Sequence, residues 1–226
     1  MTWPTSADAL AAEQARLAGL APPLWTPPET GRALRRAACA VVFGRGGRDD
    51  LAWAAAAVEE GHRIVATSTR FASVEASFQP GRLALREGPI LEAAVRGLAV
   101  RPDVVVVAAA GRDHPRGAGL ALQLGAVLDL PSVGVTDDPL VAAGPEPDRA
   151  WAARAPLQIG GAVVAYQVRT RGGTSPVVAH AAWRTSPEVA AEVVLGGCAL
   201  ARWPEALRAA RRIARELRAV AASTAR

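Results

Sequence analysis

The hydrophobic pattern of the first third of the chain predicts one helix followed by a three-stranded antiparallel meander. Residues 6–18 carry Leu10, Gln14 and Leu17 on one helical face, and Ser6 is a suitable N-cap. A proline-rich stretch ends this helix, and three short apolar runs follow it. The connections between the runs, GRGGRDD and EEGH, have the glycine and polar residues of hairpin turns. The expected strands are Ala38–Phe43, Leu51–Val58 and Arg63–Ser68.

Beyond residue 81 the pattern changes to alternating helices and buried strands. Apolar residues from Ile90 to Leu98 repeat at helical spacing. The run VVVVAAA after Asp103 is apolar at every position, which predicts a buried parallel strand, and SVGVT at 132–136 predicts a second one. A helix over about 117–128 connects the two. The remaining elements are predicted strands at 163–168 and 177–179 and predicted helices at 187–199 and 205–222.

This order of elements predicts a mixed α/β sheet, with three antiparallel strands and then parallel strands, flanked by helices on both faces. That is the layout of a ribonuclease-H-like fold. No repeat, low-complexity tract or linker divides the chain, so residues 1–226 are expected to form a single domain. In the last helix the apolar positions lie on one side and the arginines largely on the other, which indicates either a solvated face or a stripe that contacts phosphates. These arginines are Arg208, Arg211, Arg212, Arg215 and Arg218.

The composition indicates a folded chain with a basic surface. Half of the 226 residues are hydrophobic and 21% are charged, which excludes general disorder. All 26 basic residues are arginines, and against 21 acidic residues they give a formal net charge of +5. This balance favours polyanionic partners, although a GC-rich genome would produce the same arginine bias. Since the chain has no lysine, no amine side chain is available as a base or a Schiff-base former.

We expect a cytoplasmic protein that does not contact membranes. No apolar run reaches the ~20 residues of a membrane-spanning helix, and no secretory signal precedes the first helix. The two cysteines, Cys39 and Cys198, are too few for a disulfide framework or a structural zinc site. Cys39 is interpreted as a small buried hydrophobic residue. His62 and His180 have no metal-ligand spacing, and we assign them no role.

Four segments resemble motifs of the endonuclease V family. The segment from Phe78 to Pro89 resembles PYxPGxLxFRExP, and residues 101–136 resemble the block RPDxxLVDGxGxxHPRxxGLAxHLGxxLDxPxIGVAK. Further on, WRTSPEVA resembles GHRxSxxxA, and residues 202–208 resemble RLPEPTR. The resemblance extends from about residue 3 to residue 215. It implies a ribonuclease-H-like fold and Mg²⁺-dependent cleavage of the second phosphodiester bond 3′ to a deaminated base, chiefly the hypoxanthine of inosine, in DNA or RNA.

Most of the family's catalytic positions are replaced in this chain. The resemblance aligns Ala40 with the aspartate of the first strand, Ala108 with the aspartate of VDG, and Trp183 with the histidine of GHR. The glutamate of FRE is retained as Glu87, and Asp137 stands where a lysine follows GVA. Metal-dependent hydrolysis needs clustered carboxylates, so a single retained glutamate implies a catalytically inactive member without a cofactor. Mg²⁺ is expected only if residual activity remains, held by Glu87 at most.

The residues to which the resemblance assigns base recognition are retained more often than the catalytic residues. Phe78 is aligned with the tyrosine that wedges into the gap left by the flipped base, and its ring can still stack on a base. Ala109 replaces a glycine and is expected to narrow the base pocket. The matching residues of the turn and of the HPR motif are Pro80, Gly81, Leu83, His114 and Arg116.

Three hypotheses about function follow. The first, which we favour, is an inactive family member that binds DNA or RNA containing deaminated bases such as inosine. The second is an inactive subunit, either of an active paralogue or of a homo-oligomer, that uses its arginines and tryptophans at a protein interface. The third is an active Mg²⁺-dependent endonuclease whose metal site is rebuilt from Asp113, Asp137 or Asp138, which follow the ends of predicted strands.

Overall fold

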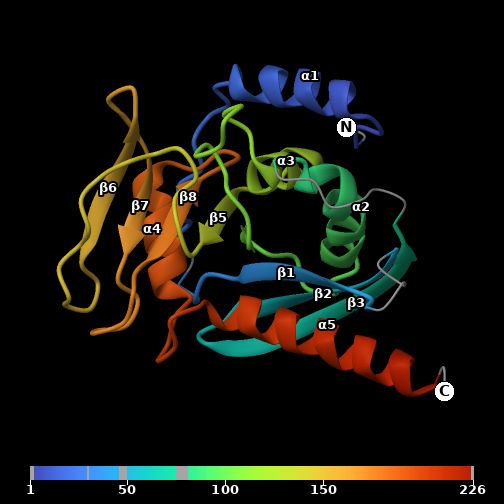
Figure 1. Ribbon diagram of the computed structural model, residues 1–226. Helices are drawn as coiled ribbons and strands as arrows, with labels where there is room; N and C mark the ends of the chain where they lie inside the picture. Colours follow the sequence, from blue (N-terminus) through green and yellow to red (C-terminus); the bar gives the residue numbers. More distant parts are fainter. Residues whose placement is uncertain (1–2, 30, 46–49, 75–80, 225–226) are drawn as a thin grey trace.

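The computed structural model describes residues 3–29, 31–45, 50–74 and 81–224 and has one eight-stranded mixed sheet between two layers of helices (Figure 1). The strand order is β3-β2-β1-β4-β5-β8-β7-β6. The strands are β1 (Arg36–Phe43), β2 (Leu51–Glu60), β3 (Arg63–Ser73), β4 (Val104–Val107), β5 (Ser132–Thr136), β6 (Arg154–Ile159), β7 (Ala162–Val168) and β8 (Val177–Ala181). The helices are α1 (Ala7–Ala18), α2 (Leu83–Arg96), α3 (Leu120–Leu128), α4 (Pro187–Gly196) and α5 (Glu205–Thr224).

The predicted fold class is confirmed. Strands β1, β2 and β3 form the antiparallel meander, β1 and β4 run parallel, and so do β4 and β5. Strand β8 returns antiparallel to β5 and extends the sheet toward β7 and β6. Within the described ranges, no helix combines the length and the apolar character that a bilayer-spanning segment requires.

Several element bounds differ from the prediction, and the two largest differences concern β6 and α2. Strand β6 was not predicted, because its sequence RAPLQI contains Pro156, and proline within a run argues against a central strand. The structure places β6 at the edge of the sheet, where a proline is tolerated. Helix α2 begins at Leu83 and not near Ile90, since it continues through Pro89, whose ring faces solvent.

Successive side chains of the central strands point to opposite faces of the sheet and pack against the two helix layers in turn. Cys39 of β1 and Val107 of β4 pack in the cluster formed with α1, α2 and α3. Ala40 of β1 and Val106 of β4 pack in the opposite cluster, which includes Leu207 of α5. The small side chains of β1 therefore let α5 lie close against this face of the sheet.

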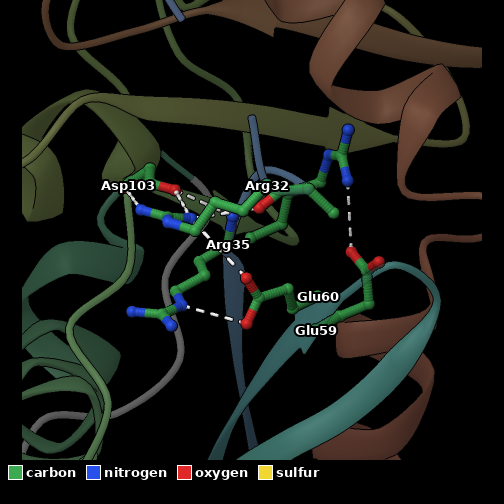
Figure 2. Close-up of polar contacts among 7 residues, drawn as sticks. Arg32, Arg35, Glu59, Glu60 and Asp103 are labelled. Atoms are coloured by element: carbon green, nitrogen blue, oxygen red, sulfur yellow. Dashed lines mark hydrogen bonds and ion pairs between the residues drawn. The ribbon is translucent and has the colours of Figure 1, made fainter. Parts of the chain in front are cut away.

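A charged network fixes the edge of the sheet where β1 and β4 begin and β2 ends (Figure 2). Asp103, the residue before β4, accepts two hydrogen bonds from the Arg32 guanidinium, both of 2.9 Å. It also accepts one of 2.8 Å from the backbone N–H of Arg35, whose side chain pairs with Glu60 at 3.1 Å. Because this carboxylate joins the two segments that lead into β1 and β4, it fixes their parallel register, with Arg36 opposite Val104.

The same edge holds a buried ion pair. Glu59 of β2 is fully buried, and its carboxylate lies 3.3 Å from the guanidinium of Arg36 on β1. The backbone N–H of His62 also donates to Glu59, which supports the turn between β2 and β3. Removing either member of such a pair leaves an uncompensated buried charge, so the pair makes this register costly to change.

We predict that Asp103→Asn destabilises the fold by about 1–3 kcal/mol at pH 7, since charge-assisted hydrogen bonds are lost. Burial raises the pKa of the Asp103 carboxyl, but the hydrogen bonds from Arg32 and Arg35 outweigh it and leave the pKa below its ordinary value. The stabilisation is therefore complete above the unfolded-state pKa and is lost as the pH falls through the folded-state pKa. Urea denaturation at pH 7 and at decreasing pH measures this, with the exposed Asp129→Asn as control. An Asp103→Asn protein as stable as the parent at pH 7 would contradict the assignment.

Candidate functional site

The pairing of β1 with β4 brings the two predicted replacement positions together. Cys39 lies directly opposite Val107 in the parallel ladder, and Ala40 and Ala108 are the next residues along their chains. Ala40 is buried, whereas Ala108 follows the last residue of β4 and is exposed. Both side chains end at a methyl group, so neither offers an oxygen to a ligand.

A cavity of about 180 Å³ lies at these strand ends, and we call it the strand-end pocket. It is bounded by the ends of β1 and β4, by one face of α2, by the start of α3 and by two arginines of α5. Its lining residues are Cys39, Ala40, Val41, Val42, Glu87, Leu91, Val107, Ala108, Leu120, Arg211 and Arg215.

Among the residues that the structure describes, Glu87 is the one carboxylate that lines this pocket. It projects from the second turn of α2 and is half-buried. Burial raises its pKa to about 7, and the nearby charge of Arg86 offsets only part of that shift. Among the described residues, no hydrogen bond or ion pair involves its carboxyl group. The adjacent Cys39 is buried, as predicted, and burial raises the pKa of its thiol to about 12, so it is not a reactive thiolate at neutral pH.

Two guanidinium groups of α5 complete the pocket. Arg211 lies with its guanidinium carbon 4.5 Å from the ring centroid of Trp203, which orients the side chain. Burial and the neighbouring Arg215 lower the pKa of Arg211, while Asp137 acts in the opposite direction. From the sequence alone, these arginines are expected only to lie on one face of a helix. Their i,i+4 spacing was the available signal, but it does not say what they reach.

The donor set of the strand-end pocket does not fit a magnesium ion. Mg²⁺ requires several oxygen ligands in near-octahedral geometry, and the protein normally supplies one or two carboxylates. Here one half-buried carboxyl group shares the pocket with two cationic side chains. Over the part of the chain that the structure describes, no group of three or more His, Cys, Asp or Glu residues is arranged to hold a metal.

The structure does not bring Trp183, which the resemblance aligns with a catalytic histidine, to this pocket. Its backbone N–H donates to Ser132 Oγ, and its carbonyl accepts from the backbone N–H of Ser132. Ser132 is the first residue of β5, which runs parallel to β4. Trp183 therefore lies at the opposite end of these strands from the strand-end pocket.

The three aspartates that could rebuild a metal site do not converge. Asp113 is fully buried, and its carboxylate accepts backbone hydrogen bonds of 2.7–2.9 Å from residues 140, 141 and 142. Asp137 is exposed and forms an ion pair with Arg202. Asp138 is exposed on the same loop. None of these carboxylates lines the strand-end pocket.

His180, to which no role is assigned from the sequence, makes polar contacts from β8 to Thr136 and Asp113. It is fully buried on β8, with Nε2 2.7 Å from Thr136 Oγ1 and Nδ1 3.5 Å from the Asp113 carboxylate. Burial lowers its pKa, and the charge of Asp113 only partly offsets this effect. The neutral imidazole and the Asp113 carboxylate thus hold the loop after β5 against β8.

Most of the predicted base-binding residues line a second cavity, of about 160 Å³, which we call the turn pocket. Gly81, Leu83, Ala109 and His114 line it together. Arg116 lies behind it and donates to Gln14 Oε1 at 3.3 Å, and Gln14 lines the pocket. Phe78 and Pro80 lie outside the described residues.

The two pockets adjoin each other, because Ala108 and Leu120 line both. The turn pocket is mostly apolar, with polar side chains at Gln14, His114, Gln123 and Thr136. Burial lowers the pKa of His114, and its Nδ1 accepts a hydrogen bond of 3.1 Å from the backbone N–H of Arg116. With Nδ1 accepting, the neutral imidazole carries its proton on Nε2, and a hydrogen bond from the ring to the backbone of Gly81 offsets part of the lowering of the pKa.

We predict that Glu87→Gln stabilises the protein above pH 7. In the parent, the folded-state pKa of about 7 exceeds the ordinary value of 4.5, so the cost of ionising a buried carboxyl grows between these pH values and is constant above them. The variant should gain roughly 1–3 kcal/mol at pH 8 and little at pH 4. Thermal or urea unfolding at both pH values, with the exposed Glu192→Gln as control, tests this. Destabilisation of Glu87→Gln at pH 8 would mean that an unrecognised cation holds the carboxylate.

Comparison with known proteins points to a single family. Residues 35–212 match the family profile described as Endonuclease V. The chain is 39% identical over 138 residues to endonuclease V of Methanopyrus kandleri, which covers 61% of this chain and 59% of that protein. The matched regions span about three-fifths of the length of the first curated relatives.

Solved structures agree over nearly the whole chain. The crystal structure of endonuclease V from Streptomyces avermitilis superposes with a TM-score of 0.85 at 31% identity, covering 98% of this chain and 96% of that one. Endonuclease V of Ciona intestinalis, at 19% identity, shares the fold with a TM-score of 0.74 and coverage of 93% and 97%. That structure is a complex with a 23mer DNA containing an inosine followed by a ribo-adenosine.

Proposed function

The chain belongs to the endonuclease V family, and we propose that it binds inosine-containing DNA or RNA without cutting the strand. The proposal has two parts, loss of metal-dependent hydrolysis and retention of base binding. Each part rests on one of the two adjoining pockets.

The groups that line the strand-end pocket support the first part of the proposal, the loss of metal-dependent hydrolysis. Hydrolysis of a phosphodiester by a metal-dependent nuclease needs an anionic hollow that binds the ion, polarises the phosphate and activates a water molecule. Ala40 and Ala108 contribute methyl groups, which leaves Glu87 as the one carboxyl group among the described residues of the lining. Arg211 and Arg215 add positive charge, which repels a divalent cation further.

The turn pocket supports the second part. Gly81, Leu83 and His114, which match the family's base-reading segments, line one cavity next to the strand ends. The related endonuclease V of Ciona intestinalis is solved with inosine-containing DNA. The arginine excess of the chain supplies the non-specific attraction that a nucleic acid requires.

We predict that the protein binds inosine-containing single strands more tightly than matched plain strands in EDTA, measured by fluorescence anisotropy. Leu140 is exposed at the turn pocket, so Leu140→Trp should fill the pocket and abolish the preference for inosine. Leu200→Trp, at an exposed position of the α4–α5 connection, is the control and should retain the preference. Equal affinity of the parent for both strands would refute the base-binding part.

We also predict that Ala40→Asp combined with Ala108→Asp creates affinity for Mn²⁺, since the two carboxylates would join Glu87 at one pocket. Calorimetry should detect binding in the double variant and none in the parent, and adding Arg211→Ala should strengthen it by removing a repelling charge. The control, Ala143→Asp, places a carboxylate at an exposed position of the loop after β5. Metal-dependent nicking of an inosine strand by the nuclease-free parent would refute the inactivity.

A further inference from the structure

The arginines of α5 differ in how their guanidinium groups are used. Arg208 pairs with Glu205 at 2.8 Å, and Arg212 pairs with Glu216 at 2.9 Å, both within the helix. Arg218 donates to the backbone carbonyl of Phe43. Within the described ranges, Arg211 and Arg215 make no hydrogen bond or ion pair. The two arginines with unused donors are therefore the two that line the strand-end pocket.

The surroundings of this pocket suit an anion. A guanidinium presents several N–H donors in a plane and forms short, strong bonds to phosphate oxygens. Arg211 is held in place by the Trp203 ring, so part of its side-chain entropy is already lost before a ligand binds. Among the described lining residues, one carboxyl group, that of Glu87, faces the two guanidinium groups, so positive charge is in excess in the pocket.

The size and position of the pocket indicate which kind of anion it could bind. A cavity of about 180 Å³ with apolar walls of alanine, valine and leucine has room for a compact tetrahedral group. Ala108 and Leu120 form the wall shared with the turn pocket. A nucleotide whose base occupies the turn pocket would thus have a neighbouring backbone phosphate within reach of the strand-end pocket.

We propose that the strand-end pocket is a metal-independent phosphate site, in which Arg211 and Arg215 hold a backbone phosphate of the bound nucleic acid. This inference rests on the proposed function, since it assumes that the ligand is a nucleic acid seated in the turn pocket. The cationic side chains take over the attraction that a divalent ion would provide. They supply no activated water, so they hold the strand without cutting it.

The test measures binding of an inosine-containing single strand in EDTA as a function of salt concentration. Arg211→Gln with Arg215→Gln should weaken binding about tenfold and lower the slope of log K against log salt by roughly 0.7 for each phosphate that the protein no longer neutralises. The matched control, Arg208→Gln with Arg212→Gln, removes the same charge from the same helix at paired positions. It should change both quantities much less. Circular dichroism and thermal unfolding of both double variants verify the fold.

A strand with a neutral methylphosphonate at one linkage next to the inosine sharpens the test. Replacement at the linkage that the two arginines hold should weaken binding to the parent and to the Arg208/Arg212 control, but not to the Arg211/Arg215 variant. Equal reductions of affinity in the two double variants would overturn the phosphate site. The positive charge of the protein as a whole would then account for the attraction to the nucleic acid. If the preference for inosine persists in that case, the proposed function stands. If the parent shows no preference for inosine, the proposed function fails and this inference fails with it.

Discussion

The parallel pairing of β1 with β4 is the constraint on which both pockets depend. Asp103 and Arg32 join the segments that enter these strands, and the buried pair of Glu59 and Arg36 fixes the same edge. With the register set there, the side chains at the other end of the strands have no freedom to separate. The chain therefore presents two methyl groups side by side at the place where the related family implies paired carboxylates.

Replacing those positions changes the electrostatics of the whole pocket. A carboxyl group that is buried without a cation is costly to ionise, and this cost raises the pKa of Glu87 to about 7. Two guanidinium groups of α5 face the same cavity, and under the proposed function they make it a pocket that attracts anions. The turn pocket next to it has the residues Gly81, Leu83 and His114 in one lining. Under the proposed function, binding and cleavage depend on different walls of adjoining cavities and are therefore separable.

The sequence predicted the architecture well because hydrophobic period and turn residues are local signals. It predicted the order of helices and strands, the meander and the meeting of Ala40 with Ala108, but it missed β6, where Pro156 contradicts the strand pattern. The site was less predictable. A motif identifies Trp183 but does not say at which end of β5 it lies. Helical period likewise separates the arginines of α5 from its apolar face, but only tertiary packing decides that Arg211 and Arg215 reach a pocket while Arg208 and Arg212 pair along the helix.

The central claim is that the strand ends hold no divalent cation, even when nucleic acid is bound. Electron paramagnetic resonance of Mn²⁺ measures this directly, since the signal of the free ion is lost when it binds. The account predicts that the protein leaves the free Mn²⁺ signal unchanged, and that the protein with an inosine-containing strand removes no more of it than the strand alone. Loss of the signal in proportion to the protein, reversed by Glu87→Gln, would contradict it.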